Sequence, residues 1–138
     1  MFYEIQTEKD IEQFLDKTNA LHDGIILNVQ YSNTGIAKAK GGGYNLDPTK
    51  IKLTLQILVT RIWDAVVEME FEDISDWQLQ CAPYYADEIQ EASVKIEEKP
   101  YKRIIWAESF WTTKEDLECG SYVIAQTMRW RFADGYFL

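Results

Sequence analysis

Hydrophobic and polar residues alternate along most of this chain with a period of two, which is typical of half-buried β-strands. The alternation is clearest at residues 51–57 and 65–71. We predict that these two segments form an antiparallel hairpin, because they follow one another with a short join. Further strands are predicted at residues 25–31, 36–40, 77–80, 84–89, 93–97, 103–107 and 122–132.

A segment near the start of the chain has the period of a helix instead. Ile11, Phe14 and Leu15 recur at i, i+3 and i+4 within residues 8–18, and Thr7 can cap the free amide groups of the first turn. Residues 112–117 can form one more helical turn. The pattern therefore predicts an N-terminal helix followed mainly by strands.

Turn residues at 32–35 predict that strand 25–31 returns as strand 36–40 in a first hairpin. The glycines and the proline of residues 41–48 then predict a mobile surface loop. On strand 25–31 the predicted apolar face consists of Ile25, Leu27, Val29 and Tyr31. On the last strand it consists of Tyr122, Ile124, Met128, Trp130 and Phe132.

The length of 138 residues, with 46% hydrophobic residues, fits one domain covering residues 1–138. We expect an α+β fold that is mostly β, with the N-terminal helix packed on an antiparallel meander sheet that curls into a sandwich or an incomplete barrel. No stretch approaches the roughly 20 apolar residues of a membrane span, and the first residues lack the features of a secretion signal. We therefore expect a soluble, cytoplasmic protein that does not associate with membranes.

The chain is acidic, with 23 Asp and Glu residues against 14 Lys and Arg residues and a formal net charge of −9. This charge repels phosphate backbones and so disfavours nucleic-acid binding, while it attracts a basic protein partner. The alternative is that the carboxylates only keep a small β-protein soluble.

Several carboxylates are candidates for a surface that binds a basic partner. Three of them share one face of strand 65–71 and its continuation, where Arg129 and Arg131 of the last strand could pair with them as a fold device. The candidate residues are Glu68, Glu70, Glu72, Asp73, Asp76, Asp87, Glu88 and Glu91. Phe110 and Trp111, in a less regular stretch, are the best candidates for exposed aromatic contacts.

The sequence offers little for catalysis. His22 is the only histidine, and Asp23 is a poor orienting partner because adjacent side chains usually point apart. We expect a structural role for both, with His22 closing the helix C-terminus or bonding strand backbone and Asp23 fixing the turn. No nucleophile motif is present, and no Gly-Lys-Ser/Thr follows the glycines at 41–43. We predict no catalytic residue, no cofactor and no metal site.

The two cysteines, Cys81 and Cys119, lie far apart in the sequence without metal-ligand spacing. We expect two buried, reduced thiols, and a disulfide between them is the alternative.

The stretch Leu21-His22-Asp23-Gly24, running into residues 25–29 after a short amphipathic helix, resembles uncharacterised small bacterial proteins in which an L/F-H-D tripeptide opens the first strand. Some families of that appearance look like immunity proteins of contact-dependent or polymorphic toxin systems. The resemblance implies a non-enzymatic intracellular protein whose acidic surface occludes a toxin. It carries over no binding residue.

Two other functions remain open. A small-molecule-binding, β-barrel-like protein or an enzyme would use a pocket within the sheet, although the predicted inward faces are apolar and favour a filled core. A component of an assembly would pair through the edge of strand 36–40, which Lys38 and Lys40 protect. The pattern favours no particular oligomeric state.

Overall fold

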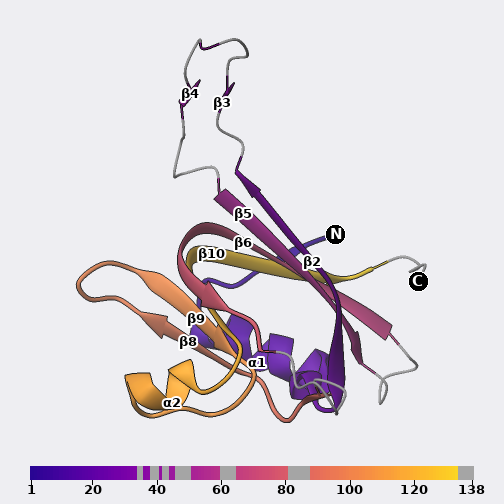
Figure 1. The fold of residues 1–138 in the computed structure, drawn as a ribbon. Coiled ribbons are helices and arrows are strands. Elements are labelled where there is room, and N and C mark those ends of the chain that lie inside the picture. The colour runs from indigo at the N-terminus through magenta and orange to yellow at the C-terminus, as the bar shows by residue number, and fades with distance from the viewer. Residues whose placement is uncertain are drawn as a thin grey trace.

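The computed structural model describes residues 1–33, 36–37, 41, 44–45, 51–59, 65–80 and 88–133, and it confirms an α+β fold that is mostly β (Figure 1). The helices are α1 (Glu8–Lys17) and α2 (Lys114–Glu118), and a short turn, Asn19–Leu21, follows α1. The strands are β1 (Tyr3–Glu4), β2 (Gly24–Asn33), β3 (Ile36–Ala37), β4 (Tyr44–Asn45), β5 (Ile51–Val59), β6 (Ala65–Gln78), β7 (Glu88–Ile89), β8 (Ser93–Glu97), β9 (Arg103–Ala107) and β10 (Tyr122–Phe132). No helix in the described ranges is long and apolar enough to cross a membrane.

One antiparallel sheet, with the strand order β7-β2-β5-β6-β10-β9-β8, forms most of the structure, and β1 adds to the side of β10. The predicted hairpin of β5 and β6 is confirmed, as are the bounds of β8, β9 and β10. The order is not that of a simple meander, because β6 is followed in the sheet by β10 and β7 lies beside β2. The sheet is open, which is closer to the incomplete barrel than to the sandwich.

The predicted first hairpin is wrong. Strand β2 pairs with β5 over most of its length, while β3 pairs with β4 in a separate two-stranded sheet. Strand β5 offers β2 a long partner with an alternating buried face, which the two residues of β3 cannot match. Strand β4 also replaces part of the loop predicted at 41–48, whose other residues lie mostly outside the described part.

Strand β6 is longer than predicted, because residues 77–78 of the strand predicted at 77–80 belong to it. Asp73 has a positive φ of 55° in the middle of this strand, and the pairing with β10 shifts register between Ile124 and Ala125. Each irregularity interrupts the alternation of apolar and polar residues, so the sequence pattern predicts two strands where the structure has one. The segment Asp73–Asp76 is called the β6 bend below.

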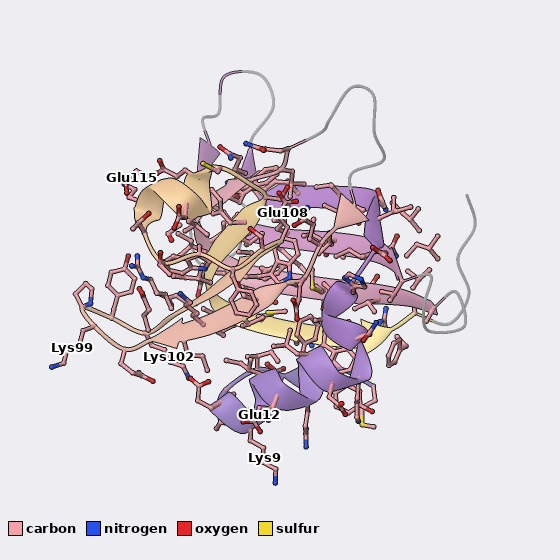
Figure 2. All side chains as sticks on the ribbon, turned by 90° about the horizontal axis from the view of Figure 1, so that it is seen from below. Lys9, Glu12, Lys99, Lys102, Glu108 and Glu115 are labelled. Carbon is pink, nitrogen blue, oxygen red and sulfur yellow. The ribbon has the colours of Figure 1, made fainter. Side chains whose placement is uncertain are left out.

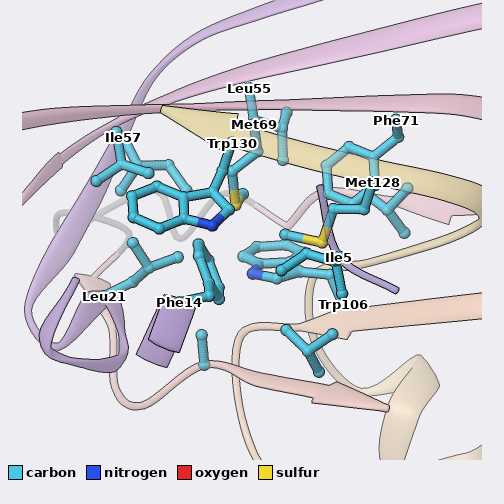
Figure 3. Close-up of a cluster of buried hydrophobic side chains, with 14 of the residues drawn as sticks. Ile5, Phe14, Leu21, Leu55, Ile57, Met69, Phe71, Trp106, Met128 and Trp130 are labelled. Carbon is cyan, nitrogen blue, oxygen red and sulfur yellow. The ribbon is translucent and has the colours of Figure 1, made fainter. Parts of the chain in front are cut away.

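The main core lies between the sheet and α1. Phe14 points from α1 toward Trp130, with ring centroids 5.3 Å apart, and Trp106 lies beside them (Figure 3). Thr7 caps α1 in a reciprocal capping box with Asp10, as the sequence predicts for the start of this helix. The fully buried strand residues on this inner face include Leu53, Leu55, Ile57, Val67, Met69 and Phe71.

A second, smaller core lies on the outer face of the sheet, the face turned away from α1. It consists of Ile105, Ala107, Leu117, Tyr122 and Ile124, with Trp111 packed against it. The predicted apolar face of the last strand is therefore wrong, because Tyr122 and Ile124 belong to the outer cluster and Met128 and Trp130 to the inner one. The alternation does not run unbroken through β10, which lies beside the β6 bend.

Candidate functional site

Three hollows of about 270, 270 and 260 Å³ adjoin one another around the β6 bend. The first, the α2 hollow, shares Arg103 with the second and Asp76 with the third, and the second and third share Ile74 and Ser75. Together they are called the β6 trough. The β6 bend contributes residues to all three hollows.

The α2 hollow has an apolar floor, formed by Ile105, Leu117 and Ile124 of the outer core. Ile105 and Ile124 face each other across β9 and β10, and Leu117 is the one buried residue of α2. Trp111 and Tyr122 complete the lining with aromatic surface. The floor therefore belongs to a packed cluster and is held in place by it.

Carboxylates and cations alternate around the rim of the α2 hollow. Glu97 and Arg103, opposite each other on β8 and β9, form an ion pair of 2.6 Å. Lys114 and Glu118, one turn apart on α2, are 3.7 Å apart at their charged atoms. The exposed Asp76 accepts a hydrogen bond of 2.8 Å from the Tyr122 hydroxyl. The rim thus holds three carboxylates and two cations.

The hydroxyl of Tyr122 is perturbed by its position in this site. Burial, followed by the hydrogen bond to Asp76 and the negative charges of Asp76 and Glu118, raises the pKa of Tyr122 to about 12. The phenol is therefore neutral at physiological pH and donates to Asp76. A second negative charge at this position is unfavourable.

Local hydrogen bonds fix α2 against the end of β6. Thr113 caps the helix, and the Asp116 carboxylate accepts hydrogen bonds from the hydroxyl and backbone amide of Thr112 and from the backbone amide of Thr113. These bonds, those from Thr112 first, hold the pKa of Asp116 below its usual range. The Gln78 side chain donates to the carbonyl oxygens of Glu118 and Gly120, at 2.9 and 3.0 Å. The C-terminal end of the short helix is thereby tied to the sheet.

The aromatic pair predicted from the sequence lies beside the α2 hollow. Phe110 is 72% exposed, whereas Trp111 is half-buried against the outer core. The Lys95 ammonium lies 3.7 Å from the centre of the Trp111 ring and donates to the Trp111 carbonyl at 2.7 Å. The indole Nε1 of Trp111 is buried and has no acceptor among the described residues. Trp111 is therefore rigidly placed, and Phe110 is free to contact a partner.

The other two hollows add aromatic and acidic groups to the trough. One is lined by Asp73, Tyr101 and Gln126, and Oδ1 of Asp73 is buried without a donor within the described ranges. The other lies beside Trp77 and Tyr31, whose rings stack 5.8 Å apart. Tyr31 is 48% exposed, so the predicted burial of its face is wrong at this edge of the sheet.

Two of the predicted acidic residues are neutralised on the flat outer face of β6. Arg129 donates to Glu70 and Arg131 to Glu68, each at 2.6 Å, which confirms the expected fold device. Lys52 also pairs with Glu70, which is only 8% exposed. Burial alone would raise the pKa of Glu70, but the bonds from Lys52 and Arg129 outweigh it and lower the pKa. Glu68 and Glu70 are therefore structural and offer little free charge.

The remaining predicted acidic residues are dispersed. Glu72 is exposed between Lys52 and Thr127 of the neighbouring strands, and Glu91 is exposed after β7. Glu88 belongs to β7, but its side chain lies outside what the structure describes, and so does all of Asp87. Of the ten predicted binding residues, the structure places Asp73, Asp76 and Trp111 in the trough, with Phe110 next to Trp111 in the chain.

His22 and Asp23 lie far from the trough in the tight connection between α1 and β2. The His22 Nδ1–H donates to the carbonyl of Gln90, and Nε2 is 3.7 Å from an Asp23 carboxylate oxygen. Asp23 has a φ of 57°, and its backbone amide donates to Ile89 at 2.8 Å. These bonds join His22 and Asp23 to β7 and its flank, and the two side chains approach each other more closely than predicted.

Metal ligands and thiols in the described part of the chain bear on chemistry other than binding. Nowhere there do three His, Cys, Asp or Glu side chains gather as metal ligands. Cys119 is a free thiol but exposed, so its predicted burial is wrong, and Cys81 lies outside the described residues. Cys119 follows α2 directly, where the chain turns back toward β10.

Sequence reasoning missed Glu97, Arg103, Lys114 and Glu118. Two signals were present in the sequence. Glu97 and Arg103 lie at the facing ends of two consecutive predicted strands, 93–97 and 103–107, and so could pair across them. Lys114 and Glu118 have the i, i+4 spacing of a helical ion pair. Neither signal says that both pairs meet at one hollow, since that depends on where α2 packs.

Comparisons with protein-family models, with curated proteins and with solved structures found no match.

Proposed function

We propose that this protein is a non-enzymatic protein-binding module, and that the β6 trough binds a basic protein partner. The α2 hollow carries this proposal, because it combines an apolar floor with a carboxylate-rich rim and adjoins the exposed Phe110. Aromatic anchors at the centre of an interface usually supply most of the binding energy. Complementary charge around them sets the rate of association and the choice of partner.

The net charge of −9 agrees with a basic partner. The resemblance of the Leu21-His22-Asp23 segment to immunity-like proteins suggests the type of partner, a basic intracellular toxin whose surface the trough would cover. In that case the Asn19–Asp23 connection supports the fold and does not touch the partner, because its side chains bond to the flank of β7.

A small-molecule binder is the second candidate. Against it, the inner face of the sheet is filled by buried apolar side chains, and the α2 hollow lies on the outer face. A surface for a protein therefore fits better than a pocket for a metabolite.

Capture from a lysate with defined variants tests the proposal. The bait would be the tagged wild type, a rim variant (Asp76→Asn, Glu97→Gln, Glu118→Gln) and a matched α1 variant (Glu8→Gln, Glu12→Gln, Asp16→Asn). Both variants lose three negative charges, but the second loses them on α1, which lies on the other side of the molecule from Glu115 on α2 (Figure 2). Retained proteins would be quantified by mass spectrometry at low and high salt.

We expect a basic protein that the wild type and the α1 variant retain at low salt and that the rim variant loses. High salt should release it from both, because exposed charges are screened. Equal retention by all three proteins, or a partner that only the α1 variant loses, would contradict the proposal.

A further inference from the structure

We propose that the α2 hollow receives the side chain of one arginine or lysine of the partner. The aliphatic stem would lie on the apolar floor, and the charged head would lie among the rim carboxylates. This inference rests on the proposed function and specifies the group that the trough recognises.

The two layers of the hollow match the two parts of such a side chain. Lysine and arginine bury their methylene stems on apolar surface while the charged head stays near water. Ile105, Leu117 and Ile124 supply the apolar surface, and the hollow of about 270 Å³ is open to solvent at its rim. A purely apolar side chain would leave the rim carboxylates without a new donor.

The rim has acceptor atoms left for a cation. Both bonds from Arg103 go to Oε1 of Glu97, and Tyr122 uses only Oδ2 of Asp76. Among the described residues the Glu118 carboxylate pairs only with Lys114, at 3.7 Å and near the surface, where such pairs are weak. Each of the three carboxylates therefore retains an oxygen that can accept from a guanidinium or an ammonium group.

An anionic ligand fits the rim less well. Arg103 already bonds Glu97, and Lys114 lies beside Glu118, so a bound anion would have to compete with these carboxylates. Lys95 is engaged with Trp111 and is not available to an anion either.

The test uses blocked tripeptides whose central residue is arginine, lysine, citrulline, norleucine or glutamate. Citrulline has nearly the shape of arginine without its charge, and norleucine has the stem without a polar head. Binding to the isotope-labelled full chain would be followed by NMR, with the Trp111 indole N–H and the Leu117 amide as reporters, because both residues line the hollow. The Trp106 indole, in the inner core, is the internal control.

We expect saturable shifts of Trp111 and Leu117 with arginine and lysine, and binding weaker by roughly fivefold or more with citrulline and norleucine, since solvent-exposed ion pairs contribute up to about 1 kcal/mol each. The rim variant should lose the preference for arginine over citrulline, and the α1 variant should keep it. Equal binding of arginine and citrulline, stronger binding of glutamate, or no shift at Trp111 and Leu117 with any peptide would overturn the inference.

The two experiments can fail separately. If the wild type captures a basic partner that the rim variant loses, but the arginine peptide does not move Trp111 and Leu117, the proposed function stands and the single-side-chain inference is wrong. If the arginine peptide binds as expected but no protein is captured, the hollow recognises cationic side chains and the proposal of a protein partner is contradicted.

Discussion

Gly24 shows how strongly a single residue can constrain this fold. A Cβ atom at this position would lie 2.7 Å from the Leu21 carbonyl oxygen and 2.9 Å from the side chain of Ile57. The first contact is with backbone, so it cannot be relieved by a rotamer change. The glycine is therefore needed where the turn after α1 meets strand β5.

We predict that Gly24→Ala lowers the free energy of unfolding by about 1–3 kcal/mol, the usual cost of overpacking. Gly120→Ala is the matched control, because its Cβ would meet only the end of the Glu108 side chain, which can move. Chemical denaturation of the two variants measures the difference. Similar losses of stability in both variants would show that the close approach at Gly24 is not the cause of the destabilisation.

Tyr122 gives a second prediction at this scale. Its pKa of about 12 reflects burial first and then Asp76, so Asp76→Asn should lower the pKa while leaving it above the ordinary value of 10.0. Carbon-13 NMR of the labelled tyrosine ring can follow this titration. A pKa unchanged by Asp76→Asn would mean that the hydrogen bond contributes nothing.

The same shift has a consequence for stability. Because folded Tyr122 keeps its proton to a higher pH than the unfolded chain, the free energy of unfolding should fall as the pH rises from about 10 toward 12. Below pH 10 both states are protonated and Tyr122 contributes no pH dependence. Because Asp76→Asn should lower the pKa of folded Tyr122, it should narrow the pH range over which the free energy of unfolding falls.

At the scale of elements, the β6 bend determines where the candidate site lies. Asp73 adopts a φ of 55° within a strand, a conformation that Asp and Asn tolerate and β-branched residues do not. We predict that Asp73→Val destabilises the protein by about 1–3 kcal/mol, the usual cost of such strain. Asp73→Asn should preserve stability, because it keeps the tolerance for this conformation and removes a buried charge.

Thermal and chemical denaturation of the two Asp73 variants decide this prediction. If Asp73→Val is as stable as the wild type, the positive φ is not required for the bend. If Asp73→Asn loses as much stability as Asp73→Val, the carboxylate rather than the backbone conformation holds the bend.

The pairing of β6 with β10 gives a prediction on acid stability. Arg129→Met leaves the buried Glu70 with Lys52 alone, and we expect a loss of about 1–3 kcal/mol at pH 7, typical of an underpaired buried group. The lowered pKa of Glu70 stabilises the wild type above the ordinary carboxyl pKa of 4.5, and this contribution is lost as the pH falls through the folded value. The difference between wild type and variant should therefore shrink in acid.

Arg131→Met is the matched control for this prediction. It removes the same charge from the same strand and leaves Glu68 with a hydrogen bond of 3.1 Å from Gln56. Urea denaturation at pH 7 and at pH 3 would compare both variants. A pH-independent difference between wild type and Arg129→Met would contradict the role assigned to Glu70.

Elements with an undisturbed period could be predicted from the sequence. The pairing of β5 with β6 follows from alternation and a short join, and the bounds of β8 and β9 follow from the polar residues and the proline that flank them. The bend of β6 could not be predicted, because Asp73 and the register shift break the pattern instead of producing one. The pairing of β2 with β5 was missed for a different reason. The segment between them in the sequence forms the separate β3–β4 sheet, and the chain returns to the main sheet only at β5.

At the scale of the whole molecule, the sequence predicted the sign of the surface charge but not its distribution. The row Glu68, Glu70 and Glu72 was visible as a strand face, yet the arginines of β10 neutralise two of its members. The α2 hollow assembles groups from β6, β8, β9, β10 and α2, and no local pattern indicates that these meet. Of the binding residues predicted from the sequence, only Asp73, Asp76 and Trp111 line the trough.

The central claim is that the β6 trough, beside Phe110, is where a basic protein partner binds. A photo-crosslinking amino acid at position 110, compared with one at the exposed Gln13 of α1, tests it most directly. We predict that position 110 crosslinks a basic protein at low salt, that high salt or the rim variant abolishes the product, and that position 13 yields none. Crosslinking of the same protein from position 13 but not from 110, or a product from 110 that the rim variant leaves unchanged, would contradict the account.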